Sequence, residues 1–162
     1  MLINEIKELA KKEKVNVLFD MDGTLVEYLP DGSDRRNVPG SDFYTFNRPL
    51  NYMIKVAKRI SKIKNVEVHI LSNCPLNEQI EQKINWLKKY APFINLKNVN
   101  IICYENITYN KDEKRFLKGN LIKEKFPNQK CFLIEDDLRN IKAVNSLFGG
   151  EVVAYHISSL IK

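Results

Sequence analysis

The sequence lacks a long apolar run and a Cys-x-x-Cys pair. A membrane-spanning helix needs about 20 consecutive apolar residues, so we expect no association with a membrane. An acid, Glu5, comes early and no long apolar stretch accompanies it, so we also expect no secretory signal peptide. An odd number of cysteines without such a signal predicts reduced thiols and a cytoplasmic protein. The three cysteines are Cys74, Cys103 and Cys131.

Internal repeats and low-complexity segments are absent as well, and the composition is that of a folded protein. Of the 162 residues, 44% are hydrophobic and 28% are charged, which favours a soluble globular chain and predicts one domain over residues 1–162. The net charge of +6 could attract phosphate esters or nucleic acid, but most lysines fall on polar faces of predicted helices, where no ligand is needed. Examples are Lys55, Lys58, Lys62, Lys83, Lys88 and Lys89.

Short apolar segments alternate with segments of helical periodicity along the chain. The expected strands cover residues 15–19, 66–71, 99–104, 130–134 and 151–157. The expected helices cover residues 2–13, 49–64, 77–90, 112–126 and 139–148. This alternation predicts an α/β fold with a central parallel sheet of about five strands, covered by helices on both faces. In such folds ligands bind beyond the carboxyl ends of the strands.

Polar residues occupy the ends of three of these strands. The pentapeptide Asp-Met-Asp-Gly-Thr at 20–24 follows the first strand, Ser72 and Asn73 follow the second, and three acids at 135–137 follow the fourth. Acids gathered at one edge repel one another unless a cation neutralises them, and a shell of oxygen ligands suits Mg²⁺. Zinc is disfavoured because Cys74 is the only cysteine or histidine at this edge.

These motifs resemble those of the haloacid dehalogenase superfamily, specifically its phosphatase branch. Asp-x-Asp-Gly-Thr at a strand end is similar to the first motif of that superfamily, Ser72 to the second, and the acids at 135–137 to the fourth, so the resemblance spans about residues 15–157. It implies a Rossmann-like, three-layer α/β/α hydrolase fold with a minimal cap loop. It also implies a Mg²⁺-dependent phosphomonoester hydrolase, because a second Asp two residues after the first indicates phosphoryl transfer and not dehalogenation.

The resemblance also implies roles for individual residues. Asp20 would attack phosphorus and form an aspartyl-phosphate, and Asp22 would act as the general acid and base. Ser72 would hydrogen-bond a phosphoryl oxygen, helped by backbone N–H groups that include that of Asn73. Mg²⁺ would be held by the Asp20 carboxylate, the Asp22 backbone carbonyl and an acid of the fourth motif.

The three acids at 135–137 can match the two acids of the fourth motif in two ways. The metal-binding pair is either Glu135 with Asp136 or Asp136 with Asp137. Asn140 favours the first pair, because deoxyribonucleotidase-like phosphatases carry Asn at that spacing after their two acids. Asp136 belongs to both registers, and a leftover acid could cap the following helix.

Three lysines are candidates for the residue that would pair with the phosphate and with Asp20. They are Lys111, Lys114 and Lys118. We choose Lys111, because it falls where the loop after the third strand meets the predicted helix, near the edge of the sheet. Lys114 would lie about one turn further on, within that helix.

Residues 25–48 interrupt the alternation and occupy the position of a short cap or flap. Residues 39–49 resemble the start of the cap region in 5′-nucleotidases of the deoxyribonucleotidase type, in which aromatic side chains hold the base. Phe43, Tyr44 and Phe46 could stack on a base in this way. The alternative is that Phe43 and Phe46 anchor the loop to the core, and we weight the two interpretations equally.

Three functions remain open from the sequence. The favoured one is hydrolysis of a nucleotide or similar small phosphate ester. The second is a phosphatase for a macromolecule, such as a nucleic-acid 3′-phosphate or a phosphoprotein, since the cap is short and the chain is basic. The third is a non-catalytic binding module of the same fold, against which the intact Asp20, Asp22 and Ser72 argue.

Overall fold

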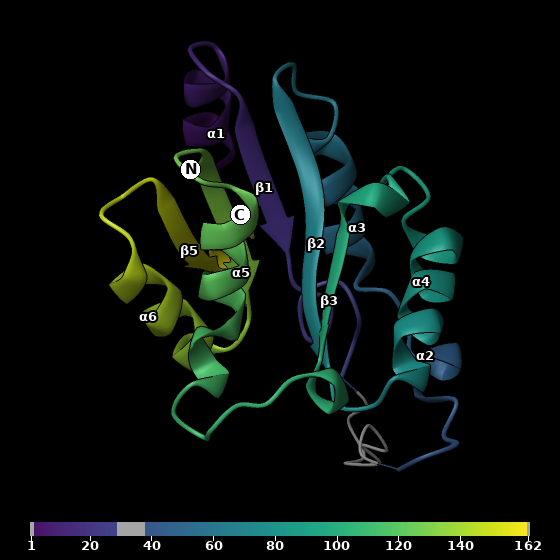
Figure 1. Cartoon of the computed structure of the whole chain (residues 1–162). Helices are drawn as coiled ribbons and strands as arrows, with labels where there is room; N and C mark the ends of the chain where they lie inside the picture. The colour runs from purple at the N-terminus through teal and green to yellow at the C-terminus, as the bar shows by residue number, and fades with distance from the viewer. Residues whose placement is uncertain (1, 29–37, 162) are drawn as a thin grey trace.

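The computed structural model describes residues 2–28 and 38–161, and its centre is a five-stranded sheet (Figure 1). The strands follow the order β3-β2-β1-β4-β5, and every neighbouring pair is parallel. They are β1 (Val15–Phe19), β2 (Val66–Cys74), β3 (Val99–Cys103), β4 (Lys130–Glu135) and β5 (Val152–His156). The predicted α/β class with a parallel sheet of about five strands is confirmed.

Helices cover both faces of this sheet (Figure 1). They are α1 (Leu2–Ala10), α2 (Phe43–Phe46), α3 (Asn51–Ile60), α4 (Glu78–Tyr90), α5 (Leu117–Lys125) and α6 (Leu138–Leu147). Short 3-10 helices are η1 (Leu96–Asn98), η2 (Tyr104–Asn106), η3 (Lys114–Phe116) and η4 (Ile157–Leu160). Along β1, Val17 and Phe19 join one hydrophobic cluster with α1, α3 and α4, whereas Leu18 joins the other with α5 and α6. This alternation with a period of two confirms the three-layer α/β/α arrangement.

Of the element boundaries that differ from the prediction, two affect the site. Strand β2 continues to Cys74, because residues 72–74 pair with Ile101, Ile102 and Cys103 of β3. Ser72 and Asn73 therefore lie within the strand and not after it. Helix α5 begins at Leu117, later than the predicted start at 112, because residues 114–116 form the separate 3-10 helix η3.

The described part of the segment 25–48 is attached to α4 and to the end of β1. Val26 forms isolated bridges with Asp22 and Pro49. Further along, the indole N–H of Trp86 in α4 donates to the carbonyl of Asn47, and Gln82 donates to the carbonyl of Ser41. Part of the predicted cap, residues 29–37, lies outside the described residues.

The remaining expectations concern membranes and thiols. Within residues 2–28 and 38–161, none of the helices combines the length and apolar character required to cross a bilayer. Cys74, Cys103 and Cys131 are all free and buried, as expected of reduced thiols.

Candidate active site

The carboxyl ends of β1, β2 and β4 meet at one edge of the sheet, around a cavity of about 480 Å³. Parallel pairing in register brings these ends together, because Phe19 lies opposite both Ile70 and Ile134. The cavity is lined mainly by polar side chains from the strand ends and from the segments that follow them. They include Asp20, Asp22, Asn73, Lys111, Lys118, Glu135 and Asp136.

Asp20 lies at the centre of this edge, directly after β1. Its backbone N–H donates to the carbonyl of Ile134 at 2.9 Å, which continues the sheet pairing and fixes the residue beside β4. The side chain is buried, and its Oδ1 lies 3.0 Å from Nζ of Lys118. Burial, followed by the negative charge of Glu135, raises the pKa of Asp20 to about 6, although the Lys118 ammonium opposes this rise.

Asp20, Glu135 and Asp136 form a carboxylate cluster whose oxygens lie within 4.8 Å of one another. Burial and the charge of Asp20 also raise the pKa of Asp136, whose carboxylate accepts a hydrogen bond from the Tyr28 hydroxyl. Burial and neighbouring negative charge thus disfavour the ionised forms of Asp20 and Asp136. The cluster offers only oxygen donors, a set that fits a hard divalent cation such as Mg²⁺.

The third acid of the fourth motif turns away from this cluster. The Asp137 carboxylate is the N-cap of α6, where it accepts a hydrogen bond from the Arg139 backbone N–H and forms an ion pair with the Arg139 guanidinium. Hydrogen bonding to Arg139 lowers the pKa of Asp137. Of the two registers, the geometry therefore places Glu135 and Asp136 beside Asp20, and it leaves Asp137 as the helix cap.

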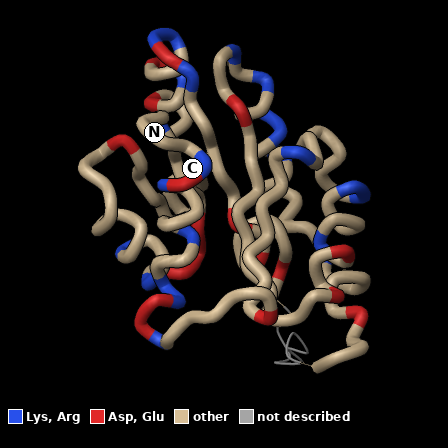
Figure 2. Tube along the Cα trace, in the orientation of Figure 1, with Lys and Arg blue, Asp and Glu red and all other residues tan. Residues whose placement is uncertain are grey.

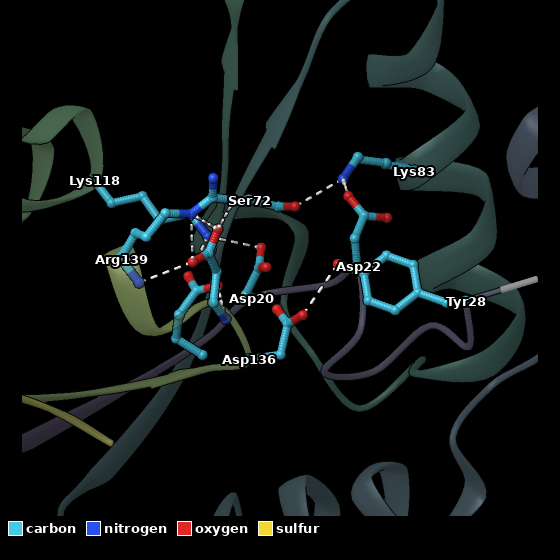
Figure 3. Close-up of polar contacts among 10 residues, drawn as sticks. Asp20, Asp22, Tyr28, Ser72, Lys83, Lys118, Asp136 and Arg139 are labelled. Carbon is cyan, nitrogen blue, oxygen red and sulfur yellow. Dashed lines mark hydrogen bonds and ion pairs between the residues drawn. The ribbon is translucent and has the colours of Figure 1, made fainter. Parts of the chain in front are cut away.

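Lys118, and not Lys111, contacts the nucleophile candidate. Its side chain is 3% exposed, and its ammonium binds Asp20 (Figure 3). The same ammonium binds Glu135. Burial alone would lower the pKa of Lys118, but Asp20 and Glu135 raise it above its ordinary value, so this lysine is charged. Lys111 is exposed at the rim of the cavity. The sequence-based choice depended on a helix start at 112; because α5 starts at Leu117, Lys118 occupies its first turn, at the sheet edge.

Asp22 is held by hydrogen bonds from two other segments. Its Oδ1 accepts from the Tyr44 hydroxyl at 2.8 Å, and its Oδ2 accepts from Nζ of Lys83 at 2.7 Å. The carboxylate is 15% exposed and lines the cavity. Asp22 is therefore accessible from the cavity but fixed in orientation.

Lys83 is a residue of this site that sequence reasoning missed. We expected it on a solvated helix face, but the structure buries it completely, and its ammonium lies between Asp22 and Ser72 (Figure 3). The inward face of α4 consists of Gln79, Lys83, Trp86 and Leu87. Lys83 lies one turn before Leu87, and this spacing was the available signal, but a search for apolar periodicity passes over a lysine.

Gly23 follows Asp22 and has a positive φ of 71°, a backbone conformation that residues other than glycine rarely adopt. A Cβ atom at this position would lie 2.3 Å from Oδ2 of Asp136 and 2.4 Å from the Tyr28 ring. The glycine thus lets the loop after β1 approach the acidic cluster closely.

The other predicted site residues occupy different environments. Asn73 lines the cavity, whereas Ser72 is completely buried beside it and is bonded to Lys83. Phe43 is buried in the core, and Phe46 is 76% exposed. Tyr44 is also buried and reaches the site through its hydroxyl. None of these three aromatic residues lines the cavity among the described residues.

Comparison with known proteins finds solved structures that share this fold. No protein-family model matches the chain, and no curated protein sequence matches it. Solved structures do resemble it, among them a chain of the Pnkp1/Rnl/Hen1 RNA repair complex, with a TM-score of 0.64 and 20% identity over 89% of this chain. A haloacid dehalogenase-like hydrolase from Burkholderia xenovorans LB400 has a TM-score of 0.56 and 14% identity, covering 88% of this chain and 81% of its own.

These likenesses place the fold among haloacid dehalogenase-like hydrolase folds. At such low identities they establish the fold alone. The chain spans 43% of the matched chain in the RNA repair complex, so it corresponds to part of that protein.

Proposed function

We propose that this protein hydrolyses phosphate monoesters through a covalent intermediate on Asp20. The observation that carries the proposal is the position of the Asp20 carboxylate. It lies beside a buried, charged Lys118 and within 4.8 Å of the Glu135 and Asp136 oxygens, at the wall of a polar cavity. A carboxylate, a fixed cation and a cation-binding acid cluster together provide a nucleophile and charge stabilisation for phosphoryl transfer.

The reaction would proceed in two steps. First, an Asp20 oxygen bonds to phosphorus while the bond from phosphorus to the ester oxygen breaks, and Asp22 gives a proton to that departing oxygen. Second, Asp22 removes a proton from water, whose oxygen attacks phosphorus. The bond to Asp20 then breaks, inorganic phosphate leaves and Asp22 is protonated again.

The remaining residues would stabilise charge. The ammonium of Lys118 would offset negative charge on Asp20 and on the phosphoryl oxygens, while Ser72 and the N–H of Asn73 would donate hydrogen bonds to those oxygens. Asp20 and Asp136, with Glu135 beside them, would hold Mg²⁺. When bound, the cation neutralises charge between the nucleophile and the phosphate.

A nucleotide or similar small phosphate ester is the substrate that we favour. The cavity volume of about 480 Å³ is in the range of small-molecule sites. The test is hydrolysis of p-nitrophenyl phosphate and of nucleoside monophosphates, with Mg²⁺ and with EDTA. Asp20→Asn should abolish Mg²⁺-dependent hydrolysis, whereas the matched control Asp112→Asn, on an exposed loop position, should leave it unchanged. Full activity in Asp20→Asn would contradict the proposal.

The phosphorylated end of a nucleic acid is a second candidate substrate, favoured by the cationic rim of the cavity. Lys111, Lys114, Arg115 and Arg139 all line the cavity. Basic and acidic residues lie close together on the loop that carries three of them (Figure 2). Nζ of Lys114 lies 4.2 Å from the centre of the Tyr104 ring, which packs on Tyr109. Cations beside aromatic rings suit phosphodiesters and bases, and the likeness to a chain of an RNA repair complex is compatible with this candidate.

Substrate preference and salt dependence separate the two candidates. If a nucleic-acid end is the substrate, Lys114→Ala should lower kcat/KM for a 3′-phosphorylated oligonucleotide several-fold and leave p-nitrophenyl phosphate hydrolysis unchanged. The control Lys123→Ala, an exposed lysine of α5, should affect neither substrate. Oligonucleotide hydrolysis should also fall steeply between low and high salt. Equal salt dependence for both substrates would favour the small ester.

A further inference from the structure

Lys83 has no role in the proposed reaction, yet its buried ammonium contacts two residues of the site. The side chain is 0% exposed, and Nζ lies 2.7 Å from Oδ2 of Asp22 and 2.7 Å from Oγ of Ser72 (Figure 3). It also lies 4.8 Å from the centre of the Tyr44 ring. Taking a charged ammonium out of water is costly, and an apolar residue of similar size often packs as well. The position of Lys83 therefore calls for a role beyond packing.

The contacts of Asp22 indicate what that role is. The Tyr44 hydroxyl lies 2.8 Å from Oδ1 and 3.0 Å from Oδ2, while Lys83 binds Oδ2 alone. Two donors from different segments thus fix the rotation of the carboxylate, and they leave its edge toward the cavity accessible. A general acid transfers a proton efficiently only when it is held within hydrogen-bond reach of the departing oxygen.

The contact with Ser72 has a second consequence. An ammonium group only donates hydrogen bonds, so Ser72 must accept from Lys83 through an oxygen lone pair. The single hydroxyl hydrogen of Ser72 must then point away from Lys83. Among the described residues no acceptor takes that hydrogen, so it remains available for a phosphoryl oxygen.

We propose that Lys83 is a positioning residue for phosphate ester hydrolysis, which orients the Asp22 carboxylate toward the leaving oxygen and directs the Ser72 hydroxyl toward the phosphate. This inference rests on the proposed function. Lys83 itself touches neither the leaving group nor phosphorus. It acts through Asp22 and Ser72, and Tyr44 supports the same carboxylate.

The test compares substrates that need a proton donor to different extents. An alkyl phosphate releases a poor leaving group and depends on the general acid, whereas p-nitrophenyl phosphate releases a good one and depends on it little. We expect Lys83→Met to lower kcat for the alkyl phosphate at least tenfold more than kcat for p-nitrophenyl phosphate. The control Lys88→Met, an exposed lysine on the same helix, should leave both values unchanged.

A double variant shows whether Lys83 acts through Asp22. In an Asp22→Asn background, Lys83→Met should lower alkyl phosphate hydrolysis much less than it does in the wild-type background, because residues that act as a unit give non-additive effects. The loss that remains is the part that acts through Ser72. Effects that multiply, or an equal loss with both substrates in Lys83→Met, would overturn the inference.

Folding and the proposed function are tested separately. If Lys83→Met does not fold, Tyr44→Phe provides the test, because it removes one hydroxyl bonded to the same carboxylate. Tyr44→Phe should also lose more activity on the alkyl phosphate than on p-nitrophenyl phosphate. Equal losses with both substrates would overturn the inference. A wild-type protein that hydrolyses neither ester would contradict the proposed function itself. An active protein without leaving-group selectivity in these variants would contradict only the inference about Lys83.

Discussion

The ammonium of Lys118 lies 3.0 Å from Oδ1 of Asp20 and also binds the Glu135 carboxylate at 2.5 Å. One buried cation from the first turn of α5 thus joins carboxylates at the ends of β1 and β4. The rim residue Lys111 carries the same charge but is exposed. The two lysines therefore differ in what they can contribute to the proposed reaction.

Substitution of each lysine tests this difference. Lys118→Met should lower kcat/KM for p-nitrophenyl phosphate by about 100-fold or more, the size of effect expected when a preorganised charge is removed from a phosphoryl-transfer site. Lys111→Met should change it by no more than a few-fold, because a solvent-exposed charge acts weakly. Steady-state kinetics with both variants measures the ratio, and a larger loss in Lys111→Met would reverse the assignment.

Cation binding by the acidic cluster should be visible in stability. Millimolar Mg²⁺ should raise the melting temperature of the wild-type protein by about 5–10 °C if the free cation is about 100-fold above its Kd. Asp136→Asn should remove most of this increase, since it takes away one of the three clustered carboxylates. Asp137→Asn is the matched control, because Asp137 caps α6 and should leave the increase intact. Thermal unfolding with Mg²⁺ and with EDTA gives both values; an equal increase in Asp136→Asn would exclude the cluster as the binding site.

The pKa of Asp20, raised to about 6, predicts how the stability of the metal-free protein depends on pH. The folded state holds this proton more tightly than the unfolded chain does, so the contribution of Asp20 to stability is complete below its ordinary pKa of 3.8, decreases as pH rises to about 6, and is constant above. At pH 8, Asp20→Asn should therefore raise the free energy of unfolding by about 1–3 kcal/mol.

Urea unfolding in EDTA at pH 4.5 and pH 8 checks this prediction. The gap between Asp20→Asn and wild type should narrow at the lower pH. Asp137 has a lowered pKa, so the stability that it contributes is present above its ordinary pKa and is lost as pH falls. Asp137→Asn should accordingly fail to reproduce the gain, and a gap of the same size at both pH values for Asp20→Asn would count against the burial argument.

Two glycines with nearly equal backbone conformations allow a matched comparison. Gly23 and Gly40 have φ values of 71° and 74°, so alanine strains the backbone similarly at both. A Cβ at position 23 would collide with Asp136 and Tyr28, whereas one at position 40 has no atom of a described residue within 4 Å. Gly40→Ala should cost about 1 kcal/mol of unfolding free energy and keep activity. Gly23→Ala should cost more and lower activity at least tenfold; equal losses of activity in the two variants would show that the close approach does not matter.

Much of the fold was readable from the sequence because its signals are local. Apolar strands of about five residues alternate with amphipathic helices, so the parallel sheet and its carboxyl edge could be predicted, together with the gathering of Asp20, Ser72 and the acids at that edge. The end of β2 was placed too early, because Ser72 and Asn73 are polar. Their strand conformation depends on pairing with β3, which is not a local property.

The positions of Lys118 and Lys83 could not be predicted from the sequence for a related reason. The choice of Lys111 rested on a helix that starts at residue 112, which would put Lys111 where the loop meets that helix, near the sheet edge. The chain forms η3 first, so the helix register moves to Lys118. Lysine is usually exposed to solvent, so the sequence predicts an exposed side chain at position 83. Lys83 is buried because its ammonium binds Asp22 and Ser72, and these contacts are visible only in the folded structure.

The strand order β3-β2-β1-β4-β5 has a consequence for synthesis of the protein on the ribosome. Strands β1, β2 and β3 are adjacent in the sheet and leave the ribosome first, so they can pair before the rest of the chain exists. Asp20 is then present, but Lys118, Glu135 and Asp136 arrive only with α5 and the end of β4. A nascent chain can therefore pair three of its five strands well before it contains all the residues that we propose hold a cation and a phosphate. The proposed site is complete only when β4 takes its place beside β1.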